Sequence, residues 1–209
     1  MLENSFGPED FKNISGVSRE TLEKLRLYFS LLIEWQGRFN LIGKGTLKHI
    51  WHRHFLDSAQ LKNLCGLGCS RVVDLGSGAG FPGMVLAVMG QTGVELIESN
   101  KKKCLFLEEV SMSTETSVLV NKVRFEQVSH PSKADVVTAR AVAPLPSLMK
   151  EIERWVKPDG VALLHKGMTV DREIAEAYKT WDFELKRHQS VTDPRGAILE
   201  ISGIRSVDV

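Results

Sequence analysis

The chain has 209 residues, of which 43% are hydrophobic and 25% charged, and its formal net charge is +1. A protein that depends on nucleic-acid affinity alone is usually more basic, so a nucleic-acid partner would have to be met by a local patch. The sequence contains no apolar run near the roughly 18 residues that a membrane span requires, and its first residues lack the pattern of a secretory signal. We therefore expect a cytoplasmic protein with no membrane partner.

The first third of the chain has helical periodicity. Apolar residues recur at spacings of three and four over residues 18–35, which predicts an amphipathic helix with Ser18 as its N-cap. A second helix is expected over roughly residues 46–64, and the glycine-containing stretch 66–70 ends this part. We expect residues 1–66 to form an N-terminal helical cap.

From Arg71 onward, short apolar runs alternate with helical stretches. Strands are expected at 71–75, 94–98, 117–121, 134–139, 161–165, 183–190 and 197–203, and helices at 82–90, 101–113, 145–156 and 170–180. This alternation indicates an α/β fold with a doubly wound, mostly parallel sheet. The short turn at 193–196 favours an antiparallel hairpin between the last two strands. Residues 67–209 should thus carry a seven-stranded sheet with its last strand reversed, in one compact unit with the cap.

Three cysteines, Cys65, Cys69 and Cys104, are too few for a disulfide scaffold, and no second pair follows at the spacing of a zinc site. We expect reduced thiols. The stretch His49-Ile50-Trp51-His52-Arg53-His54 does not place two histidine rings on one helical face, and no acidic cluster accompanies it. No metal site is predicted.

Residues 74–83 read DLGSGAGFPG and follow the apolar pair Val72-Val73. Ligands of open α/β sheets bind beyond the carboxyl ends of the strands, and glycines allow a ligand to approach the backbone closely. Pro82 is expected to be the first residue of the next helix, where its missing N–H costs nothing. A tight turn without a ligand would explain the glycines as well.

Two acidic residues narrow the choice of ligand. Asp74 precedes the glycines, where an anion favours a ligand with a cationic or donor group over a pyrophosphate. Glu98 ends the next strand, where a carboxylate accepts ribose hydroxyls. The glycine spacing also differs from the G-x-G-x-x-G dinucleotide fingerprint. These features favour S-adenosylmethionine, with a dinucleotide as the alternative.

Several short motifs together match one known family. They are residues 74–83, Glu98-Ser99, Lys101-Lys102, Ala139-Arg140-Ala141, Lys166-Gly167, Phe39-Asn40-Leu41-Ile42 and Arg53-His54-Phe55-Leu56-Asp57-Ser58. With them, from about residue 20 to about residue 203, the chain resembles the glucose-inhibited division protein B family of bacterial 16S rRNA guanine-N7 methyltransferases. Pro194-Arg195-Gly196 stands where that family usually has Glu-Arg-His.

The resemblance implies a Rossmann-like fold of the class I S-adenosylmethionine-dependent methyltransferases. It also implies methyl transfer to N7 of one guanosine in the 530 loop of 16S rRNA. The family's cofactor contacts fall by position on Gly76, Phe81, Phe125, Glu126 and Arg140. Together with the residues of the loop, the expected cofactor site comprises Asp74, Gly76, Ser77, Gly78, Gly80, Phe81, Glu98, Phe125, Glu126 and Arg140.

The methyl transfer expected at this site needs no catalytic base from the protein. The stretch after residue 138 lacks the Asn/Asp-Pro-Pro-Tyr/Phe loop typical of exocyclic amine methylation, and the cysteines lie away from where C5 methylation needs a nucleophile. Guanine N7 carries an in-plane lone pair, so no proton has to be removed before attack. We predict no obligate general base, and Arg140 is the candidate for positioning the target or the cofactor.

Residues 44–58 are locally basic and form the best patch for phosphates. The residues expected to contact RNA are Lys44, Lys48, Arg53, His54, Lys166 and Arg195. The expected partner is 16S rRNA, in a partly assembled small-subunit particle because the net charge is near neutral, and the expected state is a monomer. Two other functions stay open from the residues: an NAD(P)-dependent oxidoreductase, and a methyltransferase-like RNA-binding protein without catalysis.

Overall fold

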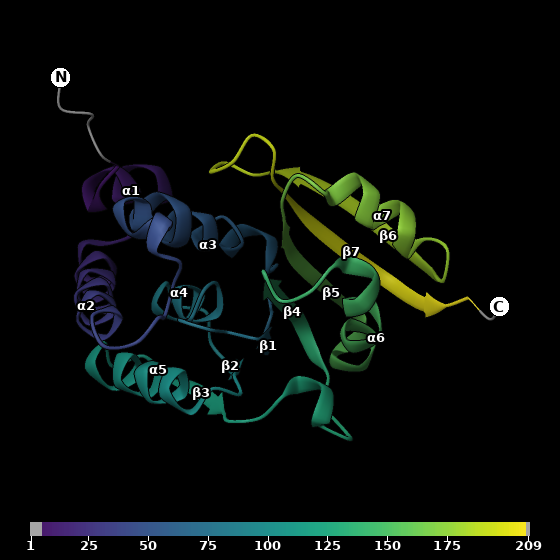
Figure 1. The fold of residues 1–209 in the computed structure, drawn as a ribbon, viewed down its shortest axis with the longest axis horizontal. Coiled ribbons are helices and arrows are strands. Elements are labelled where there is room, and N and C mark those ends of the chain that lie inside the picture. The colour runs from purple at the N-terminus through teal and green to yellow at the C-terminus, as the bar shows by residue number, and fades with distance from the viewer. Residues whose placement is uncertain (1–5, 208–209) are drawn as a thin grey trace.

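A computed structural model describes residues 6–207 of the chain. Seven strands form one sheet in the order β3-β2-β1-β4-β5-β7-β6 (Figure 1). The strands are β1 (Val72–Leu75), β2 (Val94–Ile97), β3 (Val118–Asn121), β4 (Ala134–Arg140), β5 (Val156–Lys166), β6 (Trp181–Gln189) and β7 (Ala197–Ser206). Neighbouring strands pair in parallel from β3 to β5, and β7 pairs antiparallel with both β5 and β6. The predicted fold class, with its reversed last strand, is confirmed.

The central strands form because their side chains are buried on both faces of the sheet. Adjacent residues of β1 point to opposite sides: Val72 belongs to the core beneath the N-terminal helices, and Val73 belongs to the core beneath α6 and α7. Leu96 and Ile97 divide in the same way in β2. Strands buried on both faces read as continuous apolar runs, which is the pattern visible in the sequence.

Helices cover both faces of the sheet (Figure 1). The first core joins the N-terminal helices to α4 (Gly83–Val88) and α5 (Lys101–Ser113), and the second joins α6 (Leu145–Trp155) to α7 (Val170–Ala177). The N-terminal helices α1 (Pro8–Ser15) and α2 (Arg19–Gln36) therefore share one core with the sheet.

The helix predicted over roughly residues 46–64 is present only as a series of short and irregular helical turns. The segment consists of the 3₁₀ turn η1 (Lys44–His49), the π-helical turn η2 (Trp51–Leu56), the single turn α3 (Asp57–Ala59) and the 3₁₀ turn η3 (Lys62–Leu64). Apolar periodicity indicates that a segment is helical, but it does not resolve the hydrogen-bond spacing. Short π-helical turns are frequent at functional sites, and this one carries Arg53 and His54.

One helix was not predicted, and two element boundaries differ from the predictions. Helix α1 is absent from the predicted elements, although Pro8 at its start and Gly16 in the left-handed conformation at its end are ordinary signals for a helix of this length. Helix α4 begins at Gly83, and Pro82 is its N-cap residue rather than its first residue. Strand β5 already begins at Val156, where α6 ends.

Within residues 6–207, no helix is both long and apolar enough to cross a membrane. In the same residues, no three histidine, cysteine or acidic side chains are grouped as a metal site would require. Burial raises the pKa of Cys65 to about 12 and also raises the pKa values of Cys69 and Cys104, so these thiols stay protonated near neutral pH.

The N-cap of α2 provides a test of local stability. The Ser18 side chain accepts a hydrogen bond from the Thr21 amide at 3.1 Å, and removing such a cap costs about 1 kcal/mol. We expect Ser18→Ala to lower the free energy of unfolding in urea by about that amount. The matched control is Ser30→Ala on the exposed face of the same helix. Alanine is the better helix former there, so this control should be neutral or stabilising; equal losses in both variants would contradict the assignment of the cap.

Candidate functional site

The glycine-rich loop leaves the carboxyl end of β1 and turns its amides toward the end of β2. The amides of Gly76 and Ser77 both donate to the carbonyl of Ile97, at 2.9 and 3.0 Å. The amide of Gly78 donates to the Glu98 carboxylate at 2.8 Å, and that of Gly80 donates to the Ser77 carbonyl at 2.7 Å. A cradle for phosphate needs free amides. Here four are engaged, and one of them faces a carboxylate.

Asp74 holds the two ends of the loop together. Its carboxylate is buried and accepts hydrogen bonds from the Thr138 hydroxyl at 2.7 Å and from the Gly83 amide at 3.2 Å. Burial raises the pKa of this carboxyl to about 6. The sequence predicts that Asp74 contacts the cofactor, and this stays a prediction; its side chain is only 1% exposed, and each of its oxygens accepts one hydrogen bond from within the protein. Asp74 is the next-to-last residue of β1, and the sequence cannot show which way its side chain points.

Two glycines of the loop are in close contact with other segments. At Gly76, where φ is +69°, an added Cβ would lie 2.8 Å from a methyl carbon of Val142 in the β4–α6 loop. At Gly80, where φ is +93°, it would lie 2.5 Å from the Tyr28 hydroxyl oxygen and 2.7 Å from the Cβ of Met84. Gly78 differs, because an added Cβ there would meet only a carbonyl oxygen at 3.8 Å. The loop is thus packed on two sides and open at Gly78.

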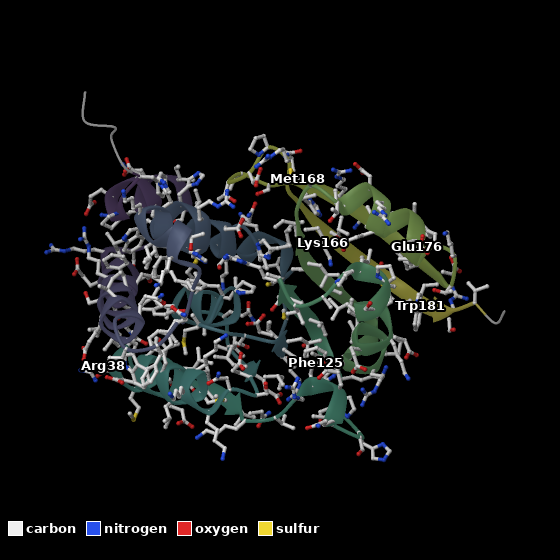
Figure 2. The ribbon with its side chains drawn as sticks, viewed as in Figure 1. Arg38, Phe125, Lys166, Met168, Glu176 and Trp181 are labelled. Carbon is white, nitrogen blue, oxygen red and sulfur yellow. The ribbon has the colours of Figure 1, made fainter. Side chains whose placement is uncertain are left out.

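Glu98 lies beside the open part of the loop. One carboxylate oxygen accepts from Gly78, and the other accepts from the Asn100 amide at 2.7 Å. Each oxygen keeps a second lone pair for a ligand donor. Phe125 and Glu126 lie in the 3₁₀ turn η4 (Phe125–Gln127) after β3; Phe125 is buried and Glu126 is exposed (Figure 2).

Arg140 ends β4 and is held by the helical cap. Its guanidinium donates to the Asp57 carboxylate at 3.1 Å and to Nδ1 of His54. It also lies 5.8 Å from the centre of the Phe81 ring, in cation–π range. The guanidinium is therefore fixed between the cap and Phe81 of the glycine-rich loop.

His54 is neutral in this arrangement. Burial, followed by the charge of Arg140, lowers the pKa of His54 to about 3. Its Nδ1 therefore accepts from Arg140 while Nε2 donates to the Thr46 hydroxyl, at 2.8 Å. The sequence predicts an RNA contact for His54. The structure places its ring in the interior, where it orients Arg140.

Asp57 connects the cap to three other segments. Besides Arg140, its carboxylate accepts from the Thr192 hydroxyl at 2.5 Å. Nε2 of His165 lies 2.8 Å from the Asp57 carbonyl oxygen. Burial lowers the pKa of His165, so this ring is also neutral and donates from Nε2. Asp57 thus joins the cap to the ends of β4 and β5 and to the β6–β7 turn.

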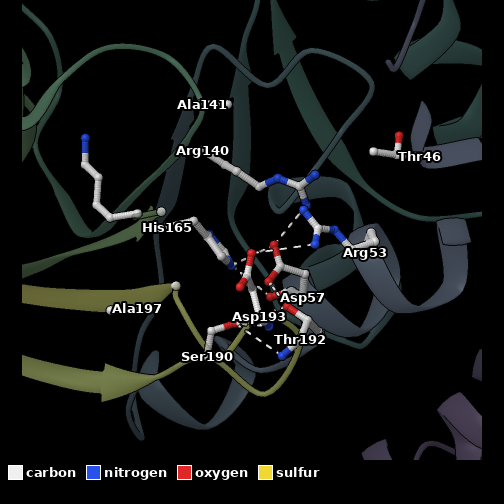
Figure 3. A pocket seen from close by; sticks show the side chains of 13 residues that line it. Thr46, Arg53, Asp57, Arg140, Ala141, His165, Ser190, Thr192, Asp193 and Ala197 are labelled. Atoms are coloured by element: carbon white, nitrogen blue, oxygen red, sulfur yellow. Dashed lines mark hydrogen bonds and ion pairs between the residues drawn. The ribbon is translucent and has the colours of Figure 1, made fainter. Parts of the chain in front are cut away.

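A cavity of about 300 Å³ opens at this junction (Figure 3). Arg53, Asp57 and Arg140 contribute charges, and His165 and Thr192 contribute polar atoms. Arg53 lies 3.6 Å from Asp193, which lines the same cavity. A planar polar group with both donors and acceptors would find partners here.

The predicted RNA contacts fall into two groups. Lys44 and Lys48 lie on η1 and Arg53 lies on η2, all three exposed. Arg53 lines the cavity, whereas Lys48 lines a different pocket beside α1 and α2. Arg195 is exposed in the β6–β7 turn, 3.6 Å from Asp193. The prediction for Lys166 stays a prediction: this residue lines the cavity, but its side chain is only 8% exposed and pairs with Glu173 at 2.9 Å (Figure 2).

Sequence reasoning missed four residues that shape the site: Tyr28, His165, Thr192 and Asp193. His165 had a usable signal, since it stands near the carboxyl end of a predicted strand. Thr192 lies just before the predicted hairpin turn and Asp193 is its first residue, and nothing in the sequence pairs either of them with the cap. Asp57 belongs to a recognised motif, but its role as a junction becomes visible only in three dimensions.

Comparisons with known proteins identify the family of the chain. The family model of GidB, rRNA small subunit methyltransferase G, matches residues 21–201. A protein of Paramagnetospirillum magneticum named ribosomal RNA small subunit methyltransferase G is 51% identical over 195 residues, covering 93% of this chain and 95% of that protein. A protein of the same name from Rhodospirillum centenum is 45% identical over 200 residues, covering 96% of this chain and 92% of that protein.

Among solved structures, a glycopeptide N-methyltransferase in complex with S-adenosyl-L-methionine superposes with a TM-score of 0.58. It is 10% identical and covers 71% of this chain and 93% of its own, so the likeness concerns the fold. The sheet order and helix arrangement are those of the class I S-adenosylmethionine-dependent methyltransferases. With a family model that spans most of its length and relatives this similar, the chain belongs to the GidB family of small-subunit rRNA methyltransferases.

Proposed function

We propose that the protein transfers a methyl group from S-adenosylmethionine to N7 of a guanosine in the 530 loop of 16S rRNA. The family supports an rRNA methyltransferase. One observation supports the location of the site. The glycine-rich loop and the cavity at Arg140 meet at the same edge of the sheet, where Phe81 of the loop contacts Arg140 of the cavity. A donor site and an acceptor site for a methyl group need this proximity.

The residues around the loop fit S-adenosylmethionine. Gly78 leaves the backbone open to a ligand, and the Glu98 carboxylate beside it has acceptor capacity for two ribose hydroxyls. The adenine is expected at Phe125 and Glu126, and the methionine end along Gly76 to Phe81. The engaged amides and the carboxylate disfavour a pyrophosphate, which argues against the oxidoreductase alternative. When bound, the cofactor supplies an electrophilic methyl group on sulfur.

The protein's own part is to position the target base. Guanine N7 needs no deprotonation, and both histidines of the site are neutral because their pKa values are lowered. A donor on N7 would block attack, so Arg140 is expected to contact O6, a phosphate or the cofactor carboxylate. Orientation of this kind contributes roughly 7–11 kcal/mol in the best cases. We therefore assign no general base.

The direct test is to incubate the protein with labelled S-adenosylmethionine and small ribosomal subunits from a methylation-deficient strain. We expect label in N7-methylguanosine within the 530 loop, mapped by mass spectrometry of 16S rRNA fragments. Free 16S rRNA is the second substrate, and partly assembled particles are expected to be methylated faster. Label at another atom or in another rRNA would contradict the proposal.

Substitution of Arg140 gives the most specific test of the positioning role. Arg140→Lys keeps the charge but removes the paired hydrogen bonds to Asp57 and His54. Charged hydrogen bonds contribute about 1.5–3 kcal/mol, so we expect kcat/KM to fall by about 10- to 150-fold. The matched control is Arg154→Lys, which alters the Arg154–Glu151 pair on α6. It should retain full activity, and an equal loss in both variants would point to general destabilisation.

Lys44 and Lys48, the two lysines of η1, are expected to increase the affinity for RNA without contributing sequence specificity. We expect the double variant Lys44→Gln, Lys48→Gln to raise KM for the RNA substrate while leaving S-adenosylhomocysteine binding unchanged. For each lysine that binds a phosphate in the wild type, the slope of log K against log salt should fall by about 1. Lys179→Gln, at an exposed lysine just after α7 that pairs with Glu176, is the control. An unchanged salt slope in the double variant would exclude both lysines from the RNA interface.

A further inference from the structure

Tyr28 lies in α2, in the helical cap, yet its side chain is fully buried against the glycine-rich loop. Its hydroxyl donates a hydrogen bond to the carbonyl oxygen of Ala79. Its ring stacks on Phe81, with the centroids 5.6 Å apart and the planes 14° from parallel. The same side chain therefore contacts two residues of the loop.

The loop backbone follows the shape of this tyrosine. At Gly80, between the two contacted residues, the Tyr28 hydroxyl oxygen would lie 2.5 Å from an added Cβ. Any side chain at position 80 would therefore displace either Tyr28 or the loop. Gly80 thus serves the approach of the cap, whereas the open position for a ligand is Gly78.

The hydroxyl is suited to a fixed role as donor. Burial, followed by the charge of Asp74, raises the pKa of Tyr28 well above its usual value, so the hydroxyl keeps its proton at every working pH. A buried carbonyl that loses its donor costs more free energy than an exposed one. The bond therefore favours one position of the Ala79–Phe81 backbone over its neighbours.

We propose that Tyr28 is a positioning residue of the cofactor site: from the cap, it fixes the Ala79–Phe81 segment so that the loop is preorganised for the cofactor. The inference rests on the proposed function for the identity of the ligand. It makes the cap a structural part of the cofactor site, in addition to its place on the RNA side. Preorganisation increases affinity because less order has to be imposed on binding.

The test compares Tyr28→Phe with the wild type in two measurements. The first is calorimetric titration with S-adenosylhomocysteine, where we expect Kd to rise about 10-fold, equivalent to about 1.4 kcal/mol. The second is hydrogen–deuterium exchange in the free protein, where amides of residues 76–86 should exchange faster in the variant. KM for S-adenosylmethionine should rise, while KM for the RNA substrate should stay the same.

Two control variants separate positioning from stability. Phe11→Leu removes buried surface from the cap core, where Phe11 packs on Trp51 5.6 Å away, without touching the loop. Tyr178→Phe removes a hydroxyl from the other tyrosine, which lies far from Tyr28 in the sequence and stacks on Phe183. Both should leave Kd and loop exchange unchanged, even where Phe11→Leu lowers the melting temperature more than Tyr28→Phe does.

The outcomes are distinguishable. Unchanged Kd and unchanged loop exchange in Tyr28→Phe overturn the inference, as does an equal loss of affinity in Phe11→Leu. A wild-type protein that fails to bind S-adenosylhomocysteine overturns the proposed function instead. Faster exchange of the loop with weakened cofactor binding supports the inference.

Discussion

The carboxylate of Asp57 holds the site together because it joins segments that are far apart in the sequence. Arg140 lies 83 residues further along the chain and Thr192 lies 135 residues further, yet both donate to this one side chain. A buried ion pair adds little net stability, but leaving one partner unpaired is costly. The pair therefore contributes a specific arrangement more than general stability. It helps to fix the position of the cap over the sheet, and the cavity at Arg140 is lined by residues from both sides of this contact.

The glycine-rich loop depends on the same docking of the cap. It is packed between two surfaces: Val142 of the β4–α6 loop meets it at Gly76, and Tyr28 of the cap meets it at Gly80. The β4–α6 loop is fixed in turn, because Lys166 donates to the Ala143 carbonyl at 2.8 Å and Glu173 accepts from the Leu145 amide at 2.8 Å. The lysine predicted to bind phosphate is thus a support for the wall of the site. The glycines serve close packing at two positions and an open backbone at a third.

The sequence predicts the features that follow from periodicity and strand ends. The seven strands, the reversed β7 and the position of Glu98 were all expected, because buried strands read as apolar runs and ligands bind at their carboxyl ends. What the sequence could not predict is the direction of side chains. Asp74 is the next-to-last residue of its strand and its side chain points inward, and Lys166 pairs with Glu173 rather than facing solvent. The broken helix over residues 44–64 escaped for a related reason, since a π-helical turn keeps the apolar face while changing the hydrogen-bond spacing.

These contacts cross the boundary between the helical cap and the part of the chain that forms the sheet. A boundary at residue 66 separates helical from alternating sequence, and it matches the change in element type. It does not divide the site. The cap supplies Asp57 and His54 to the arginine at the cavity, and it supplies Tyr28 to the loop, so both halves of the proposed reaction rest on residues before the boundary. The proposed reaction needs no proton transfer and depends on the geometry of donor and acceptor, which a cap that shares one core with the sheet can fix. The helical cap is therefore better understood as one wall of the proposed site than as a separate RNA-binding domain.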